Sequence, residues 1–315
     1  MAKGKGSAKK AAGKAAKVRE QLEALDREAL EAVDPAPPPR LAERLRTRPG
    51  VRLEQVDPRS TPGFGGGKAE GAAALAAGAE ELSGLQERLF AASRGGEDRR
   101  SVLLVVQGMD TAGKGGIMRH VVGAVDPQGV RITSFKAPTS EEREHDFLWR
   151  IRRALPAAGM IGVFDRSHYE DVLVVRVHEL VPVDEVEQRY DQINAFEREV
   201  ADAGTTVVKV MLHISAVEQK ERLAQRLERP DKHWKYNPKD VDERLRWHDY
   251  QQAYEIALDR CSTDVAPWFV VPADRKWYAR WAVQQLLLDA LTDLDPQWPV
   301  ADFDVEAEKV RLALA

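Results

Sequence analysis

The sequence predicts an α/β fold with three layers, in which helices cover both faces of a five-stranded, mainly parallel sheet. Short runs of apolar and β-branched residues alternate with stretches of helical spacing, which is typical of such sheets. Several runs are apolar nearly throughout, as strands buried on both faces should be. The chain has 315 residues with 43% apolar content, so it is long enough to bury a core of that size.

The composition narrows the class of protein. No run approaches the roughly 18 apolar residues that a membrane span needs, and the N-terminus lacks the apolar segment of a secretory signal. We therefore expect a cytoplasmic protein with no membrane partner and, at a net charge of −4, no nucleic-acid partner. The single cysteine, Cys261, excludes an intramolecular disulfide, and its place at a predicted helix end favours ordinary packing.

The N-terminal region divides into two parts. Residues 1–17 are rich in lysine and are expected to be a disordered basic tail, which is either a solubilising segment or an arm that attracts polyanions. Residues 18–97 form a helical extension: helical spacing over 17–34 stops at the four prolines of 34–40, and a Gly-rich loop follows at 62–67. Residues 68–93 are then predicted to be a helix with an apolar stripe of Leu75, Leu82, Leu85 and Leu89.

The core is predicted to span residues 98–295, with a C-terminal segment at 296–315. Its strands are expected at 101–107, 130–135, 160–165, 205–214 and 268–272, because these runs are too short and too β-branched for helices. The sequence shows no internal repeat and no second domain besides the N-terminal extension.

A phosphate-binding loop is the strongest local signal. The stretch GMDTAGKGG (108–116) follows an apolar strand, precedes a helical segment and has the P-loop spacing G-x-x-x-x-G-K. Its glycines let the backbone curl so that successive N–H groups face a phosphate, and Lys114 adds a full positive charge. The expected phosphate-binding residues of the loop are Gly108, Met109, Thr111, Ala112, Gly113, Gly115 and Gly116. With this motif, the predicted three-layer fold is of the P-loop kinase type.

One position of the loop departs from the usual pattern. Gly115 replaces the Ser or Thr whose hydroxyl normally contacts Mg²⁺, so another group must hold the metal. Asp110 lies inside the loop, where a carboxylate would repel phosphate unless a cation bridges the two. Asp110 is therefore predicted to be a metal ligand, a base or both.

A second carboxylate, Asp165, is the last residue of the predicted apolar strand 160–165. P-loop enzymes place a second magnesium contact at such a strand end, so Asp110 and Asp165 are the predicted metal ligands. Arg166 would clamp a phosphate, or alternatively form a structural salt bridge. Ser167 is expected to cap the following helix, and His168 to have a satisfied structural role rather than to bind a metal.

A basic lid is predicted after the fourth strand. Residues 220–239 hold seven basic and three acidic residues, with helical spacing up to Arg229 and prolines on both sides of the next segment. Arg226 and its neighbours Arg229, Lys232 and Lys235 would neutralise charge on a transferring phosphoryl group. Trp234 and Tyr236 would either stack on a nucleobase or pack the lid against the core.

Three motifs in this order, GMDTAGKGG, FDRSHYEDVL (164–173) and RLERPDKHWKYNPKD (226–240) followed by RWHDYQQAYE (246–255), resemble those of the family-2 polyphosphate kinases. The resemblance runs from about residue 45 to 295, and RSHYEDVLVVRV (166–177) is similar to the subgroup of polyphosphate:nucleotide phosphotransferases that act on AMP and ADP. It implies a fold like that of thymidylate and adenylate kinases, with a helical lid at about 226–245.

The resemblance also implies roles. Asp110 matches the loop aspartate that positions the metal or the acceptor, Lys114 the phosphate-binding lysine, Asp165 and Arg166 the Asp-Arg pair, and Arg226 the lid arginine. Lys232 and Lys235 match basic positions that track the polyphosphate chain. The implied cofactor is Mg²⁺, with Mn²⁺ as a substitute, and the implied partners are inorganic polyphosphate, adenine or also guanine nucleotides, and further copies of the chain in a homodimer or homotetramer.

The expected reaction is in-line transfer of the terminal phosphoryl group between polyphosphate and AMP or ADP, in either direction and without a covalent enzyme intermediate. Two alternatives remain. One is a P-loop kinase of a small metabolite, and the other is a non-catalytic protein that binds polyanions or nucleotides. The second alternative would not require Asp110, Lys114, Asp165 and Arg166 together.

Overall fold

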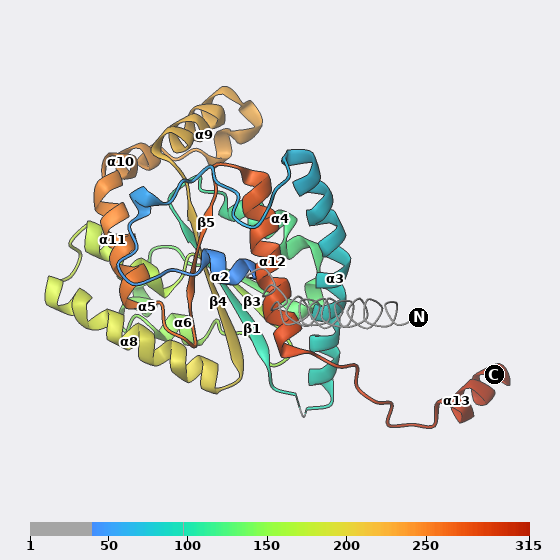
Figure 1. Cartoon of the computed structure of the whole chain (residues 1–315). Coiled ribbons are helices and arrows are strands. Elements are labelled where there is room, and N and C mark those ends of the chain that lie inside the picture. The colour runs from blue at the N-terminus through green and yellow to red at the C-terminus, as the bar shows by residue number, and fades with distance from the viewer. Residues whose placement is uncertain (1–39, 97) are drawn as a thin grey trace, which may run out of the picture. The chain divides into compact units, whose positions relative to one another are not determined.

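The computed structural model describes residues 40–96 and 98–315 and contains one five-stranded sheet (Figure 1). Every neighbouring pair of strands is parallel, in the order β2–β3–β1–β4–β5. The strands are β1 (Ser101–Gly108), β2 (Val130–Ser134), β3 (Ile161–Asp165), β4 (Thr205–His213) and β5 (Trp268–Pro272). The predicted α/β class and the five-stranded parallel sheet are thus confirmed.

Each of the five predicted strands forms, with ends that differ by one residue at most. The prediction of 268–272 is met without change, whereas 130–135 ends at Ser134 and 205–214 ends at His213. Strand β1 is buried at every position, as its apolar sequence requires for the centre of a covered sheet. Strand β2 lies at an edge of the sheet and exposes Ile132, so unlike β1 it is not buried on both faces.

The helices α3 (Lys68–Arg94), α4 (Lys114–His120) and α12 (Lys276–Leu294) cover one face of the sheet (Figure 1). The predicted helix at 68–93 is confirmed as α3, and its stripe of Leu82, Leu85 and Leu89 is buried in this layer. Gly71 lets α12 approach closely, because a Cβ atom there would lie only 2.2 Å from the Trp277 ring.

The opposite face is covered by α6 (Trp149–Arg152), α7 (Val174–Val177), α8 (Val183–Asp202) and α11 (Trp247–Arg260). The two helical layers around one sheet confirm the predicted three-layer arrangement. Cys261 follows α11, is fully buried and has its thiol pKa raised to about 12, mainly by burial. The expectation that Cys261 packs in the core is therefore confirmed.

The predicted lid corresponds to three consecutive elements. Helix α9 (Ala216–Glu228) leads into the 3₁₀ helix η5 (Pro230–Lys235) and then α10 (Lys239–Leu245). The helical spacing expected up to Arg229 thus ends one residue earlier. Trp234 is 78% exposed, so this side chain does not pack the lid against the core.

Shorter elements complete the described chain: α2 (Leu41–Leu45), η1 (Leu53–Gln55), η2 (Val122–Ala124), η3 (Pro127–Gly129), α5 (Ser140–Arg143), η4 (His168–Asp171) and α13 (Val305–Ala313). The predicted basic tail at 1–17 and the helix at 17–34 lie outside the described residues. The proposed domain boundaries stay a prediction. Within the described ranges, every helix is too short or too polar to cross a membrane.

Candidate active site

The loop between β1 and α4 has the geometry of a phosphate-binding loop. Gly108 and Gly113 have φ angles of 152° and 121°, in the region that favours glycine. A Cβ atom on Gly108 would lie 2.8 Å from the carbonyl oxygen of Leu212, so the backbones of β1 and β4 meet here without room for a side chain. Thr111 also has a positive φ, 65°, which is uncommon outside glycine and concentrates at functional sites.

The Lys114 side chain folds back onto this loop. Its Nζ donates to the carbonyl oxygens of Gly108 at 2.7 Å and Met109 at 3.4 Å. Burial lowers the pKa of Lys114, and the carboxylates of Asp110 and Asp165 oppose that effect. The first residue of α4 therefore delivers an ammonium group to the position where the loop would meet a phosphate.

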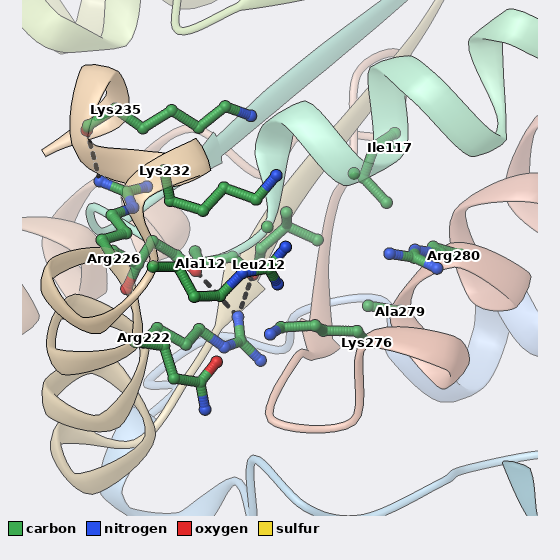
Figure 2. A pocket seen from close by; sticks show the side chains of 15 residues that line it. Ala112, Ile117, Leu212, Arg222, Arg226, Lys232, Lys235, Lys276, Ala279 and Arg280 are labelled. Atoms are coloured by element: carbon green, nitrogen blue, oxygen red, sulfur yellow. Dashed lines mark hydrogen bonds between the residues drawn. The ribbon is translucent and has the colours of Figure 1, made fainter.

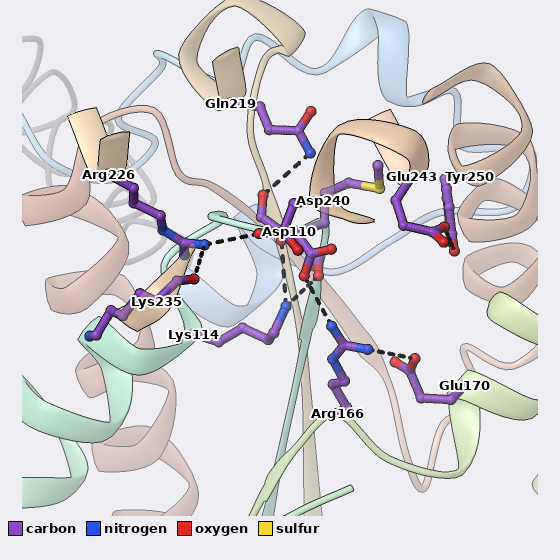
Figure 3. Close-up of polar contacts among 12 residues, drawn as sticks. Asp110, Lys114, Arg166, Glu170, Gln219, Arg226, Lys235, Asp240, Glu243 and Tyr250 are labelled. Carbon is purple, nitrogen blue, oxygen red and sulfur yellow. Dashed lines mark hydrogen bonds and ion pairs between the residues drawn. The ribbon is translucent and has the colours of Figure 1, made fainter. Parts of the chain in front are cut away.

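Arg166 joins the loop to the turn after β3. Its Nη2 donates to Oδ1 of Asp110 at 3.0 Å, and its Nη1 lies 3.4 Å from Oε2 of Glu170 (Figure 3). Burial works against the charged guanidinium, but Glu170 and Asp110 outweigh burial and raise the pKa of Arg166. Burial also raises the pKa of Glu170, against the effect of Arg166. Arg166 is thus held between two carboxylates.

The turn that presents Arg166 is anchored in the core. Arg166 itself has a φ of 64°, and Ser167 caps η4 by accepting a hydrogen bond from the Tyr169 N–H at 3.2 Å, as the sequence predicted. His168 is buried and its Nε2 lies 3.2 Å from Oε1 of Glu197. Its Nδ1 is buried without a hydrogen-bond partner in the described part of the chain, so the expected satisfied structural role of His168 stays a prediction.

Arg226 joins the three elements of the lid next to the loop, since it lines the same cavity as Thr111 and Gly113. Its Nη1 donates to the Lys235 carbonyl oxygen at 3.0 Å and to Oδ2 of Asp240 at 3.1 Å (Figure 3). Asp240 is 9% exposed, and its pKa is raised first by burial and then by the charge of Asp110. Residues of α9, η5 and α10 therefore converge on the phosphate loop, as a lid would.

Arg222, one turn before Arg226 on α9, ties the loop to the end of β5. This arginine is 5% exposed and donates to the carbonyl oxygens of Thr111 at 2.8 Å and Ala112 at 2.9 Å. Its other terminal nitrogen donates to the carbonyl oxygens of Ala273 and Asp274. Sequence reasoning counted Arg222 among the basic residues of 220–239 without giving it this role.

A cavity of about 280 Å³ lies on one side of the loop, and we call it the cationic pocket (Figure 2). Four predicted loop residues line it, namely Thr111, Ala112, Gly113 and Gly116. The four predicted lid residues Arg226, Arg229, Lys232 and Lys235 line it too, together with Arg222, Lys276 and Arg280. Among the described residues that line this pocket there is no carboxylate.

Two further cavities lie on the other side of the loop. The central pocket, of about 470 Å³, is lined by the loop residues Gly108, Met109 and Asp110, by Arg166 and Glu170, and by lid residues that include Asp240. The outer pocket, of about 540 Å³, shares Arg166, Glu170 and Val174 with it and adds the apolar side chains Phe135, Phe147, Val175, Leu180 and Val181. Charged side chains line it as well, namely Lys136, Glu142, Arg143, Arg150, Asp171 and Arg189. The outer pocket thus continues the central one with a lining that is partly apolar and partly charged.

The structure brings most of the predicted site residues together around these pockets. Three do not line any of the three pockets within the described chain. Lys114 turns its ammonium group onto the loop carbonyls, Gly115 is exposed on the first turn of α4, and Asp165 ends β3 opposite Val106 of β1. In residues 40–96 and 98–315, no three His, Cys, Asp or Glu side chains gather as they would in a metal site made by protein ligands alone. A shared ion at Asp110 and Asp165 stays a prediction.

Sequence reasoning missed several residues of the site. Besides Arg222, these are Glu170, Asp240 and Gln219, whose Nε2 donates to the Asp110 carbonyl oxygen at 3.3 Å. Glu170 and Asp240 both lie inside the quoted motifs, four residues after Arg166 and at the end of the lid motif. Their place inside these motifs could have identified both residues, whereas nothing in the sequence around Gln219 indicated a role.

Comparisons with known proteins show the family of the chain. The family model "Polyphosphate kinase 2 (PPK2)" matches residues 67–299. The AMP/ADP-polyphosphate phosphotransferase of Meiothermus ruber is 45% identical over 81% of this chain and 95% of its own length, and the ADP-polyphosphate phosphotransferase of Rhodopseudomonas palustris is 43% identical over 70% and 78%.

A solved structure shows the same fold. The crystal structure of polyphosphate kinase 2 from Arthrobacter aurescens TC1 superposes with a TM-score of 0.86 at 57% identity, covering 88% of this chain and 98% of that one. The family match spans the phosphate loop, the Asp-Arg turn and the lid, which are the parts that build the three pockets. The chain belongs to the polyphosphate kinase 2 family.

Proposed function

We propose that this protein is a Mg²⁺-dependent phosphotransferase that moves the terminal phosphoryl group between inorganic polyphosphate and adenine nucleotides, from AMP to ADP and from ADP to ATP, and in reverse. One observation carries the proposal. On one side of the phosphate loop lies the cationic pocket, whose described lining residues include no carboxylate. On the other side lies the central pocket, which contains carboxylates and opens into the outer pocket with its partly apolar lining. The cationic pocket thus matches a polyanion that carries only charge, and the other side matches a nucleotide, which also has a base with apolar faces.

The cationic pocket suits polyphosphate. Seven basic side chains line it, and a linear polyanion without any apolar part can be recognised by such charges alone. Lys232 and Lys235 approach from the lid and Arg222 from α9 (Figure 2). Ligand phosphates here would lie beside Gly113 and Gly116 at the start of α4. The Gly116 N–H already donates to the Gly113 carbonyl oxygen at 2.7 Å, so the basic side chains would be the main partners of these phosphates.

The outer pocket suits the nucleoside. Its aromatic and branched side chains offer the apolar surface that a nucleobase needs, and Arg166 and Glu170 connect it with the central pocket. The terminal phosphate of a nucleotide bound there would therefore reach Arg166 and the loop. The names of the two curated relatives, which specify AMP/ADP and ADP, support adenine nucleotides as acceptors.

The donor set fits a hard divalent cation. Asp110 and Asp165 would hold Mg²⁺, or Mn²⁺ in its place, and substrate phosphates and water would complete an all-oxygen coordination. Such an ion neutralises phosphate charge during transfer. Both carboxylates act on the ammonium group of Lys114, which indicates that they face the same region of the loop. Asp240, next to Asp110, adds a third oxygen donor near this region.

The roles of the other residues follow from their placement. Lys114 and the loop N–H groups would hold the phosphates, while Arg166 and Arg226 would offset the charge that spreads over the transferring group. Arg226 reaches this position only with the lid placed over the loop, because α9 and α10 carry it and its partner Asp240. The closed lid would also exclude water, which prevents hydrolysis of polyphosphate.

The decisive experiment is product formation. The protein is incubated with polyphosphate, Mg²⁺ and AMP, ADP or GDP in turn, and the nucleotides are separated. ATP from ADP supports the proposal, and the three acceptors define the nucleotide range. Absence of any nucleotide product, with phosphorylation of a small hydroxylated metabolite by ATP instead, would favour the alternative P-loop kinase; polyphosphate binding without turnover would favour the non-catalytic alternative.

Two further expectations belong to the proposal. The family resemblance supports a homodimer or homotetramer, which light scattering on the full chain would test. The cytoplasmic location rests on the sequence of the N-terminus, and fractionation of cells that express the protein would test it.

A further inference from the structure

The cationic pocket has two walls of different origin. The lid wall carries Arg226, Arg229, Lys232 and Lys235. The facing wall belongs to the core: Lys276 begins α12 and Arg280 follows one turn later (Figure 2). The proposed function counts Lys276 and Arg280 only among the seven cations of the pocket, and the sequence motifs do not include them, since both lie beyond the lid motif in the sequence.

The core wall extends beyond the pocket to the end of α4. Arg280 lies near both Arg119 and Arg222, and the positive charges of these two lower its pKa in addition to burial. Burial, Arg280 and Arg119 lower the pKa of His120 in the same way. Arg119 thus places a further positive charge within reach of Arg280, where the helices α12 and α4 are in contact.

The two walls differ in how their charges are compensated. On the lid side, Arg226 pairs with Asp240, while Arg229 and Lys232 pair with Asp231. On the core side, the described part of the chain provides no ion pair for Arg119, Lys276 or Arg280. The charges that act on Arg280 are those of Arg119 and Arg222, and those that act on Lys276 are Arg222, Arg280 and Arg229, opposed by Glu218. Uncompensated like charges destabilise one another, so this wall gains most from a bound polyanion.

The core wall is also the fixed one. Helix α12 packs along α3 and buries Tyr278 and Trp281, on either side of Arg280, in the core. The Arg280 guanidinium is held against the first turn of α4, since a Cβ atom on Gly116 would lie 3.6 Å from its Nε. These cations therefore keep their positions relative to the phosphate loop when the lid opens.

We propose that Arg119, Lys276 and Arg280 form a holding site for the unreacted part of a polyphosphate chain, which keeps one chain bound through successive transfers. The inference rests on the proposed function for the identity of the polyanion. Lid opening, which nucleotide exchange requires, releases the contacts of Arg226, Lys232 and Lys235. The core wall retains the chain meanwhile, so that it can advance by one phosphate and react again.

The test is the length distribution of the products. Wild-type protein, ADP, Mg²⁺ and an excess of long polyphosphate of one defined length are incubated briefly, and the chains are separated on a gel. The holding site predicts strongly shortened chains beside untouched ones. The double variant Arg119→Ala/Arg280→Ala should instead shorten all chains gradually, and its kcat/KM for long chains should fall about tenfold or more, as expected for lost contacts to a charged group.

Substrate length separates this role from a general loss of charge. Tripolyphosphate is too short to extend from the loop along the whole wall, so the double variant should lose much less kcat/KM with tripolyphosphate than with long chains. Arg131→Ala, which removes one positive charge from the edge strand β2 against two in the double variant, should behave like wild type with both substrates. Equal losses with both lengths, or gradual shortening by wild-type protein, would overturn the holding site.

Failure of the holding site can be distinguished from failure of the proposed function. If wild-type protein forms no nucleotide product from polyphosphate, the proposed function is wrong. Calorimetric titration of the full chain with long polyphosphate then still tests the wall: an affinity that falls about tenfold in Arg119→Ala/Arg280→Ala, and not in Arg131→Ala, supports polyanion binding there. Equal affinities of the three proteins would refute it.

Discussion

Arg166 and Asp110 are joined by a hydrogen bond of 3.0 Å although 56 residues separate them in the sequence. The pair links the turn after β3 to the phosphate loop after β1. It also balances the charge of each partner, because the guanidinium neutralises a carboxylate that would otherwise repel phosphate. A phosphate in the central pocket would compete with Asp110 for Arg166, and we expect this exchange to accompany substrate binding.

The two proposed metal ligands give the first prediction. Asp110→Asn and Asp165→Asn should each lower kcat for ATP formation from polyphosphate and ADP by about 100-fold or more, since each removes a negative charge from a divalent-ion site. Far-ultraviolet circular dichroism should remain that of wild type. The control Asp242→Asn changes an exposed lid carboxylate and should retain activity. Turnover at the wild-type rate in either site variant would remove the two-aspartate ion site.

The lid arginine gives the second prediction. Arg226→Ala should lower kcat by about 100-fold, because a cation that faces the transferring group is lost. It should also raise KM for polyphosphate, and raise it more steeply with added salt than in wild type, because the remaining contacts are more exposed and are screened. Arg311→Ala, an exposed arginine of α13, is the control. Identical kinetics of Arg226→Ala and wild type across the salt series would exclude a lid role.

Arg222 gives the third prediction, which concerns stability. Arg222→Met fills similar volume but leaves four carbonyl oxygens without their donor and Glu218 without its ion-pair partner. We expect the free energy of unfolding to fall by roughly 3–5 kcal/mol, the range for removing one member of a buried charged network. Urea unfolding measures it. Lys220→Met, an exposed change on the same helix, should have little effect, and a similarly small effect of Arg222→Met would contradict the prediction.

The buried His168 gives the fourth prediction, a pH dependence. Burial lowers the pKa of His168 in the folded state, although Glu197 opposes this. The unfolded chain therefore binds a proton near pH 6.5 that the folded chain does not, and the stability contributed by neutral His168 is present above about pH 6.5 and lost as pH falls below it. Tm should decline on acidification.

A variant isolates that contribution. His120 and His213 also have lowered pKa values and act in the same direction, whereas Asp171, with a pKa raised to about 6, acts in the opposite direction. His168→Gln removes one titrating group and leaves these three. Its Tm should lie below that of wild type at about pH 8, and the gap should narrow towards about pH 5.5. A constant gap would show that His168 does not titrate differently in the two states.

The sequence predicted the fold well because local signals agreed with one another. The five strands are short, β-branched runs with clear ends, and α3 carries an unbroken stripe of leucines, so local propensity and burial favoured the same structure. The phosphate loop was equally readable, since the spacing of Gly108, Gly113 and Lys114 reflects local geometry alone. Strand ends were off by a residue because the hydrogen-bond partner decides the last position of a strand.

The sequence by itself thus determined the three-layer fold, the loop and the nature of the charges near it. Only the tertiary structure decided which charges meet: that Arg166 bonds to Asp110, that Arg222 holds the loop to β5, and that the basic residues of α12 face those of the lid. The physical reason is the distance along the chain over which each interaction acts. Backbone propensity and periodicity act over a few residues, whereas ion pairs and pockets depend on how distant elements pack, and no local pattern records that distance.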